Sequence, residues 1–231
     1  APTRRAWQRQ NEFVAAAGHE LRSPLAVIKA SLAAAEDPAL PEARRRGFLH
    51  TAQREADRLA RLTGDLQLLA AGAAGALTVR PGPVAADTLC IEVYEQFYLL
   101  ARAQGRRLTL QLPEAPLPPL VTDGGRLTQL LTILLQNALD HTSPGTPVEL
   151  TLQPAPGRLR LRVIDHGPGI PDDRKEQVFD RFFRADASRT RKENFGLGLS
   201  VARELARGLG AALTLADTPG GGATFTVDLP A

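Results

Sequence analysis

The chain has 231 residues, of which 43% are hydrophobic and 23% charged, and its formal net charge is +3. This globular mix excludes a disordered chain, and the single cysteine, Cys90, excludes an internal disulfide and favours a reducing compartment. No stripe of lysine and arginine indicates a nucleic-acid interface. No run approaches the ~20 apolar residues of a membrane helix, and no signal-peptide pattern is present, so we expect a cytoplasmic protein.

Residues 1–72 are predicted to form two long helices. In the first helix, apolar side chains recur every seven residues at Val14, Leu21 and Ile28, which is the spacing of a helix-packing seam. The turn is expected at Asp37–Pro41, where prolines stop one helix and can start the next. Two helices alone bury too little surface, so we expect the hairpin to pair with a second copy as a dimeric four-helix bundle.

The alanine- and glycine-rich stretch Ala70–Ala76 is predicted to be a hinge, and residues 73–231 are predicted to form a second domain. Strand patterns occupy Leu77–Arg80, Arg107–Leu112, Leu120–Thr122, Val148–Gln153, Leu159–Asp165, Ala212–Ala216 and Thr224–Leu229. Helical patterns occupy Val84–Ala103, Arg126–His141 and Leu197–Gly208. Strands before and after helices indicate a two-layer α/β sandwich with helices on one face of a mixed sheet.

His19 is the first candidate catalytic residue. At 100° per residue it lies about 140° from Val14 and so points away from the seam. A neutral imidazole has one ring nitrogen free to act as a nucleophile, and the adjacent Glu20 could hold the proton of the other nitrogen. Ser23 shares this helix face, and Pro24 predicts a bend just beyond it. A lone histidine on a helix is more often part of a solvated surface, so a catalytic role for His19 can be predicted only from the wider sequence pattern around it.

A nucleotide site is indicated by the string from Asp165 to Ile170, which directly follows an apolar strand pattern. A carboxylate at a strand end can accept a hydrogen bond from an adenine amino group. Gly167 and Gly169 would let the backbone approach the ring without an intervening Cβ. An ordinary acidic turn after a strand would contain the same residue types.

Asn137 lies near the end of a predicted helix for which Asp123 is a plausible N-cap. Its amide oxygen is a hard ligand suited to Mg²⁺, which takes few protein ligands and fills its octahedron with water and phosphate oxygens. An asparagine in the last turn of a helix is equally an ordinary structural feature.

Gly196, Leu197 and Gly198 open the next predicted helix and would present backbone donors to a phosphate. The charged stretch between Pro171 and Phe195 is predicted to be either a lid over the phosphates or a solvated surface loop. Within it, Arg184 could meet a γ-phosphate. Thr224, at the start of the last strand, could reach the adenine edge directly or through water.

Phe13 to Leu25 spell Phe-Val-Ala-Ala-Ala-Gly-His-Glu-Leu-Arg-Ser-Pro-Leu, which resembles the phospho-acceptor box of sensor histidine kinases of two-component systems. The later motifs follow one another in an order similar to that of the ATP-binding domain of these kinases: asparagine box, Asp-x-Gly-x-Gly, phenylalanine box, Gly-Leu-Gly and a glycine-rich last strand. That domain is shared with gyrase B, the Hsp90 chaperones and MutL. The resemblance covers nearly the whole chain and implies a helical-hairpin dimer joined to an α/β sandwich.

The resemblance implies ATP-dependent autophosphorylation on His19 and phosphoryl transfer to a response-regulator aspartate, with ATP and Mg²⁺ as cofactors. It implies that Glu20 is the general base and that Ser23 occupies a position that helps to dephosphorylate the partner. It also implies that Asn137 is the Mg²⁺ ligand and that Arg184 stabilises the transferring phosphoryl group.

By the same resemblance, Asp165 reads the adenine, Gly167 and Gly169 are the close-approach glycines, and Gly196 and Gly198 are the phosphate-loop pair. The implied partners are a response-regulator receiver domain and a second copy of the chain. Membrane contact is expected only through an upstream sensor region. The sequence identifies neither the stimulus nor the response regulator.

Three positions depart from the family pattern: Ile133 replaces a frequent first asparagine, Asp140 replaces a lysine that faces the phosphates, and Asn194 replaces a lid glycine. Because Asp140 reverses the local charge, a dimeric module that binds or dephosphorylates a response regulator, with a weak or inactive ATP site, stays an alternative. A chaperone or mismatch-repair ATPase is a third. It would have no use for the His19 box and needs a catalytic glutamate, which Gln136 cannot replace.

Overall fold

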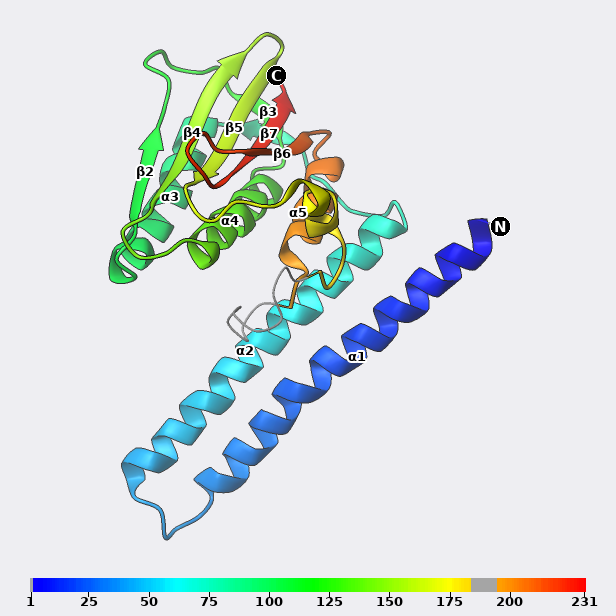
Figure 1. Cartoon of the computed structure of the whole chain (residues 1–231), viewed down its shortest axis with the longest axis vertical. Coiled ribbons are helices and arrows are strands. Elements are labelled where there is room, and N and C mark those ends of the chain that lie inside the picture. Colours follow the sequence, from blue (N-terminus) through cyan, green and yellow to red (C-terminus); the bar gives the residue numbers. More distant parts are fainter. Residues whose placement is uncertain (1, 184–194) are drawn as a thin grey trace.

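The computed structural model describes residues 2–183 and 195–231 (Figure 1). They form an antiparallel pair of long helices, α1 (Pro2–Ala35) and α2 (Glu42–Ala73), followed by an α/β domain that packs on α2. The chain continues helically past Pro24 without ending α1. No helix in these ranges combines the length and the apolarity that a bilayer span needs.

The hairpin packs mainly small side chains between its own two helices. Ala17, Ser31 and Ala52 are all buried, whereas Val14 of the predicted seam and the neighbouring Leu25 are 61% and 52% exposed. Leu21 and Ile28 of the same seam are half-buried, and Leu21 packs against the core, so the seam lies at the edge of the contact with α2. Small residues let the two helices approach closely, and Val14, Leu25 and Leu32 are left on an outer face.

The turn between the helices lies where the prolines predicted it, between Ala35 and Glu42. The Ala39 N–H donates to Asp37 Oδ1 at 2.8 Å, which closes an Asx turn. Arg45 Nε donates to the carbonyl of Ala35 at 2.8 Å and so satisfies one of the last carbonyls of α1.

The predicted hinge is shorter than expected. Helix α2 continues to Ala73, because alanine has the highest helix propensity of all residues. Gly75 ends it in the left-handed region, with φ of 66°, and the Ala76 N–H donates to the Ala71 carbonyl at 2.8 Å. Only residues 74–76 of the predicted hinge therefore lie outside the helix.

The second part is a two-layer α/β sandwich, as predicted. Its helices are α3 (Ala86–Ala103), α4 (Gly124–His141) and α5 (Gly198–Gly208), with 3₁₀ turns at Asp172–Arg174 and Gln177–Phe179. Its strands are β1 (Gly82–Val84), β2 (Arg107–Gln111), β3 (Leu120–Thr122), β4 (Pro147–Ala155), β5 (Arg158–Asp165), β6 (Ala212–Asp217) and β7 (Ala223–Pro230). The five-stranded sheet has the order β2-β4-β5-β7-β6, and β1 pairs separately with β3. The pair β2–β4 is parallel and the others are antiparallel, so the sheet is mixed.

Side chains along β5 alternate strictly between the two faces of this sheet. Leu161 and Val163 face the helices and are buried, while Arg160 and Arg162 face away on the open side. The core that the sheet forms with α3, α4 and α5 also takes in Leu69 of α2. One continuous apolar core therefore joins the sandwich to the second helix of the hairpin.

The predicted strand Leu77–Arg80 is wrong. A Cβ added at Gly208 would lie 2.6 Å from Leu77 Cδ2 and 3.4 Å from Val79 Cγ2, so both side chains pack on the end of α5. Strand pairing begins later, where β1 runs antiparallel to β3. The alternating apolar pattern of this segment reflects packing on a helix, which the pattern alone does not distinguish from a strand.

Asp123 is the N-cap of α4, as predicted. Its Oδ1 accepts a hydrogen bond from the Arg126 N–H at 3.0 Å, and its Oδ2 accepts one from the Arg80 N–H at 2.8 Å. These backbone donors hold the pKa of the Asp123 carboxyl below its usual range. Asp123 therefore attaches the segment that follows residues 74–76 to the helix that carries Asn137.

Candidate functional site

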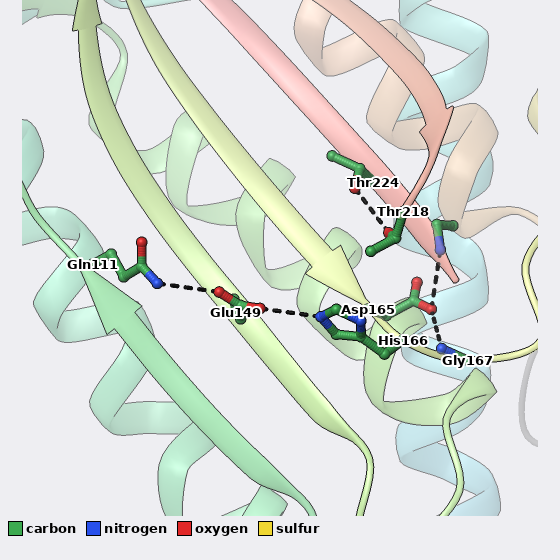
Figure 2. A network of polar contacts seen from close by, with 8 residues as sticks. Gln111, Glu149, Asp165, His166, Gly167, Thr218 and Thr224 are labelled. Carbon is green, nitrogen blue, oxygen red and sulfur yellow. Dashed lines mark hydrogen bonds and ion pairs between the residues drawn. The ribbon is translucent and has the colours of Figure 1, made fainter. Parts of the chain in front are cut away.

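Asp165 ends β5 on the face of the sheet that the helices cover, and only 4% of it is exposed (Figure 2). Its Oδ1 accepts hydrogen bonds from the Gly167 N–H at 2.9 Å and from the Ala223 N–H at 3.2 Å. Among the described residues, no hydrogen bond ends on Oδ2. Burial raises the pKa of Asp165, and the two backbone donors oppose that shift. One oxygen is thus anchored and the other can accept a ligand N–H.

The loops around Asp165 are packed so closely that only glycine fits at several positions. A Cβ at Gly167 would lie 3.1 Å from the His141 carbonyl oxygen, and one at Gly169, whose φ is 74°, would lie 3.3 Å from the Gly222 carbonyl oxygen. A Cβ at Gly222 would overlap the carbonyl of Asp165 itself. Gly222 was not among the predicted site residues, because a glycine run before a strand carries no signal of what it packs against.

Ile170 ends the loop after β5 and packs against the core. It also lines a hollow of about 380 Å³ together with Gly169, Thr218 and Gly222. The predicted loop residues from Asp165 to Ile170 are therefore brought together with the glycines that precede β7.

The Gly196–Gly198 segment lies at the N-terminus of α5, next to the helix that carries Asn137. Gly196 has φ of 70°, and a Cβ at Gly198 would lie 3.4 Å from Ile133 Cγ2. Ile133 thus fills the space beside the predicted phosphate loop. The Leu197 side chain is 1% exposed and belongs to the core, so only its backbone is placed to meet a ligand.

Asn137 is half-buried on α4, one turn after Ile133. Among the described residues, no group of three or more His, Cys, Asp or Glu side chains could hold a metal. A cation here would take Asn137 together with phosphate and water oxygens, which suits Mg²⁺. Asp140, on the same helix, accepts a hydrogen bond from Gln136 Nε2 at 2.9 Å.

Thr224 is not directed at the Asp165 side chain. Its hydroxyl lies 2.9 Å from Thr218 Oγ1 (Figure 2). Thr224 and Arg162 line a hollow on the open face of the sheet. The reason is strand alternation, which sends Phe225 into the core and Thr224 to the opposite face. Contact with the Asp165 carboxylate comes instead from the backbone N–H of Ala223.

Arg184 and Asn194 lie outside the described residues, as does the part of the predicted lid between them. The three acceptor-box residues lie on α1, with His19 and Ser23 exposed and Glu20 half-buried. Figure 1 shows α2 between α1 and the α/β domain. In the part of the chain that the structure describes, no hydrogen bond or ion pair joins an acceptor-box side chain to the loops around Asp165.

The α/β domain is attached to the second half of α2 by polar as well as apolar contacts. The Arg58 guanidinium carbon lies 4.2 Å from the centroid of the Phe195 ring. The Leu69 carbonyl accepts a hydrogen bond from Arg181 at 3.4 Å, and the Gly72 carbonyl accepts one from Arg207. These contacts join segments more than 100 residues apart, so no local sequence pattern predicted them.

Two family models match the chain. Residues 9–75 match the His Kinase A (phospho-acceptor) domain, and residues 122–231 match the histidine kinase-, DNA gyrase B-, and HSP90-like ATPase. The probable sensor histidine kinase TcrY of Mycobacterium tuberculosis is 37% identical over 224 residues, which are 95% of this chain and 45% of that protein. The chain spans about half the length of the curated relatives it matches.

Solved structures of histidine kinases have a fold similar to that of this chain. Full-length ShkA in complex with AMPPNP has a TM-score of 0.71 and 28% identity, covering 95% of this chain and 45% of that one. Histidine kinase ThkA in complex with the response regulator protein TrrA has a TM-score of 0.72 over 98% of this chain and 63% of that one. Its identity of 21% shows a likeness of fold alone.

Proposed function

The chain belongs to the sensor histidine kinases of two-component systems, and from that premise we propose that it autophosphorylates His19 with ATP and passes the phosphoryl group to an aspartate of a response-regulator receiver domain. The proposal rests on one observation, which is that the same chain contains both parts of the reaction. The acceptor-box histidine is exposed, and Asp165 is buried between close-packed glycine loops, where two backbone N–H groups donate to it.

In the proposed reaction, a ring nitrogen of His19 attacks the γ-phosphorus of ATP. The bond from that phosphorus to the β–γ bridging oxygen breaks, and ADP leaves with the electron pair. Glu20, the next residue on α1, accepts the proton of the other ring nitrogen. Mg²⁺ held by Asn137 would neutralise phosphate charge. Arg184 would stabilise the transferring group, and Ser23 would serve the dephosphorylation of the regulator.

The nucleotide is proposed to bind with its adenine at Asp165, whose Oδ2 is the acceptor for the exocyclic amino group. Gly167 and Gly169 leave room for the ring, and the backbone at Gly196 and Gly198 faces the phosphates at the N-terminus of α5. The hydrogen bonds of Asp165 support this orientation, because two backbone donors already hold Oδ1 and leave Oδ2 as the acceptor for an incoming N–H.

Phosphoryl transfer also requires a rearrangement of the two parts of the chain. We propose that residues 74–76 act as the pivot. The Arg58–Phe195 and Arg207–Gly72 contacts would then be released before the nucleotide site reaches a histidine. A second copy would pack on the exposed apolar face of α1 around Val14 and Leu25 and complete a four-helix bundle. We further propose a cytoplasmic location, with membrane contact made only by a sensor region outside this chain.

The alternative is a dimeric module that binds or dephosphorylates a response regulator but uses ATP poorly. Two observations favour it: Ile133 puts an apolar side chain beside Gly198, and Asp140 puts a carboxylate on the helix that carries Asn137. Nucleotide affinity separates the two functions, because only the kinase requires tight binding of Mg·ATP.

The test is incubation of the chain with γ-labelled ATP and Mg²⁺, with His19→Ala and Asp165→Asn beside it. Acid-labile, alkali-stable label on the parent and on neither variant is the expected result. His50→Ala, which changes an exposed histidine on α2, and Asp173→Asn, which changes an exposed carboxylate, are matched controls that should keep the label. Label on His19→Ala would refute the acceptor assignment, and absence of Mg·ATP binding by the parent would favour the alternative.

A further inference from the structure

Arg106 lies between α3 and β2, far along the chain from the nucleotide motifs, yet its side chain is buried, with 8% of the residue exposed. Its Nε donates to the Thr142 carbonyl at 3.1 Å and to the Thr142 hydroxyl at 3.2 Å. Its Nη2 donates to the same carbonyl at 2.6 Å, and its Nη1 donates to Gln104 Oε1 at 2.5 Å. One guanidinium thus holds one residue at both its backbone and its side chain.

Thr142 is the C-cap of α4. Its hydroxyl donates to the Ala138 carbonyl at 2.9 Å, so the residue that Arg106 holds is itself attached to the last turn of the helix. The same region is joined a second time to the turn before β2, because the Gly145 N–H donates to the Gly105 carbonyl at 2.7 Å. The end of α4 and the start of β2 therefore behave as one unit.

The opposite side of this unit forms the wall of the Asp165 loop. A Cβ at Gly167 would lie 3.1 Å from the His141 carbonyl oxygen and 3.4 Å from Thr142 Cγ2. The Gly167 N–H is also one of the two donors to Asp165 Oδ1. A displacement of Thr142 would therefore reach the Asp165 carboxylate through a single intervening residue.

Burying a guanidinium is costly unless it is well hydrogen-bonded. At this place the cost is offset by carbonyl acceptors at the negative end of the α4 dipole. The planar fork of arginine reaches the carbonyl and hydroxyl of Thr142 and the amide of Gln104 together, which the single ammonium of lysine does not. This position therefore requires the planar shape of the arginine side chain as well as its positive charge.

We propose that Arg106 is a positioning residue of the nucleotide site: it holds the end of α4 against Gly167, and so sets the place of Asp165 and Asn137 relative to the bound nucleotide. This inference rests on the proposed function, since it takes the Asp165 loop to be where the nucleotide binds. Arg106 itself touches no reacting atom.

The test compares Arg106→Met, Arg106→Lys and the parent chain in calorimetric titration with Mg·ATP. Arg106→Met should raise the dissociation constant about tenfold in protein that is still folded, because it removes every hydrogen bond of the guanidinium. Arg106→Lys should recover part of the affinity. Arg162→Met, which removes an arginine from the open face of the sheet, is the matched control and should leave the dissociation constant unchanged.

A second measurement separates positioning from mere stability. Amide hydrogen exchange at Gly167 and Ala223, whose N–H groups donate to Asp165, should become faster in Arg106→Met than in the control. If Arg106→Met does not fold, Thr142→Val decides, since it removes only the hydroxyl and should raise the dissociation constant about threefold.

The proposal is overturned if folded Arg106→Met shows both an unchanged dissociation constant and unchanged amide exchange. If Arg106→Met does not fold, the same result in Thr142→Val overturns it. If the parent itself does not bind Mg·ATP, the proposed function fails instead. The exchange rates at Gly167 and Ala223 in the free protein then still show whether Arg106 positions the loop.

Discussion

The α/β domain and the hairpin bury their apolar side chains to very different degrees within one chain. In the domain, Leu130, Leu134 and Phe225 are wholly inaccessible to solvent, and they belong to one core. In the hairpin, the buried residues of α1 include the small Ala17, Ser31 and Ala35, while Val14 and Leu25 are more than half exposed. The core of the domain is thus closed within one chain, with Leu69 of α2 as part of it, whereas the hairpin presents an apolar face that a second helix pair would cover.

The largest expected effect comes from breaking the completed core. Phe225→Ala should lower the free energy of unfolding of the α/β domain by about 4 kcal/mol, because it leaves a cavity beside Phe179. Urea denaturation measures this loss. Leu25→Ala is the contrasting change and should cost the single chain less than about 1 kcal/mol, because its side chain is already in solvent. Equal losses at both positions would contradict the comparison.

The next effect concerns the face that the hairpin leaves open. Leu25→Lys should raise the dissociation constant of the dimer at least about a hundredfold, since each dimer would bury two ammonium groups in that face. Sedimentation velocity at several concentrations measures it. Val121→Lys changes a residue on the α/β domain that is equally apolar and 74% exposed, and should leave the association unaltered. A dimer insensitive to Leu25→Lys would place the interface elsewhere.

A smaller effect is expected on the pH dependence of stability, and it comes from Asp65 on α2. Burial raises the pKa of Asp65 from 3.8 to about 6. Because the folded state disfavours the ionised form, the stability that Asp65 contributes is fully present below about pH 4 and is lost as the pH rises through about 6. Asp65→Asn should therefore stabilise the protein by about 1 kcal/mol at pH 8 and hardly at pH 4, after allowance for solvent screening. Thermal unfolding across this range measures the difference.

Asp57→Asn is the control for that measurement, since it changes an exposed carboxylate on the same helix. It should shift stability equally at both ends of the range. The same equal shift in Asp65→Asn would show that burial of Asp65 does not control this pH dependence.

The smallest effect is expected at Thr224. Thr224→Val should change the affinity for Mg·ATP by less than about twofold, because the hydroxyl bonds to Thr218 on the open face of the sheet. Asp165→Asn, measured in the same titration, should weaken binding far more. A large loss in Thr224→Val would mean that this hydroxyl reaches the nucleotide through water.

Local patterns were sufficient for the elements whose structure depends on neighbours in the chain. The prolines around Asp37 placed the interhelical turn, and Asp123 was identified as the cap of α4 from its place before an apolar helix. The same local reasoning misjudged Leu77–Arg80, whose alternating apolar residues pack on α5. It also misjudged Ala70–Ala73, which continue α2. In both cases the pattern was compatible with two structures, and the neighbouring elements selected one.

By itself, the sequence determined the family, and it predicted His19, Asn137 and Asp165 as the chemical groups of the site, because each stands in a short motif of residue types suited to that chemistry. The tertiary structure decided which side of a strand Thr224 occupies and which carbonyl Arg106 holds, 36 residues away along the chain. Strand register and contacts between distant segments arise only when the whole core packs. A pattern of neighbouring residues contains no information about them.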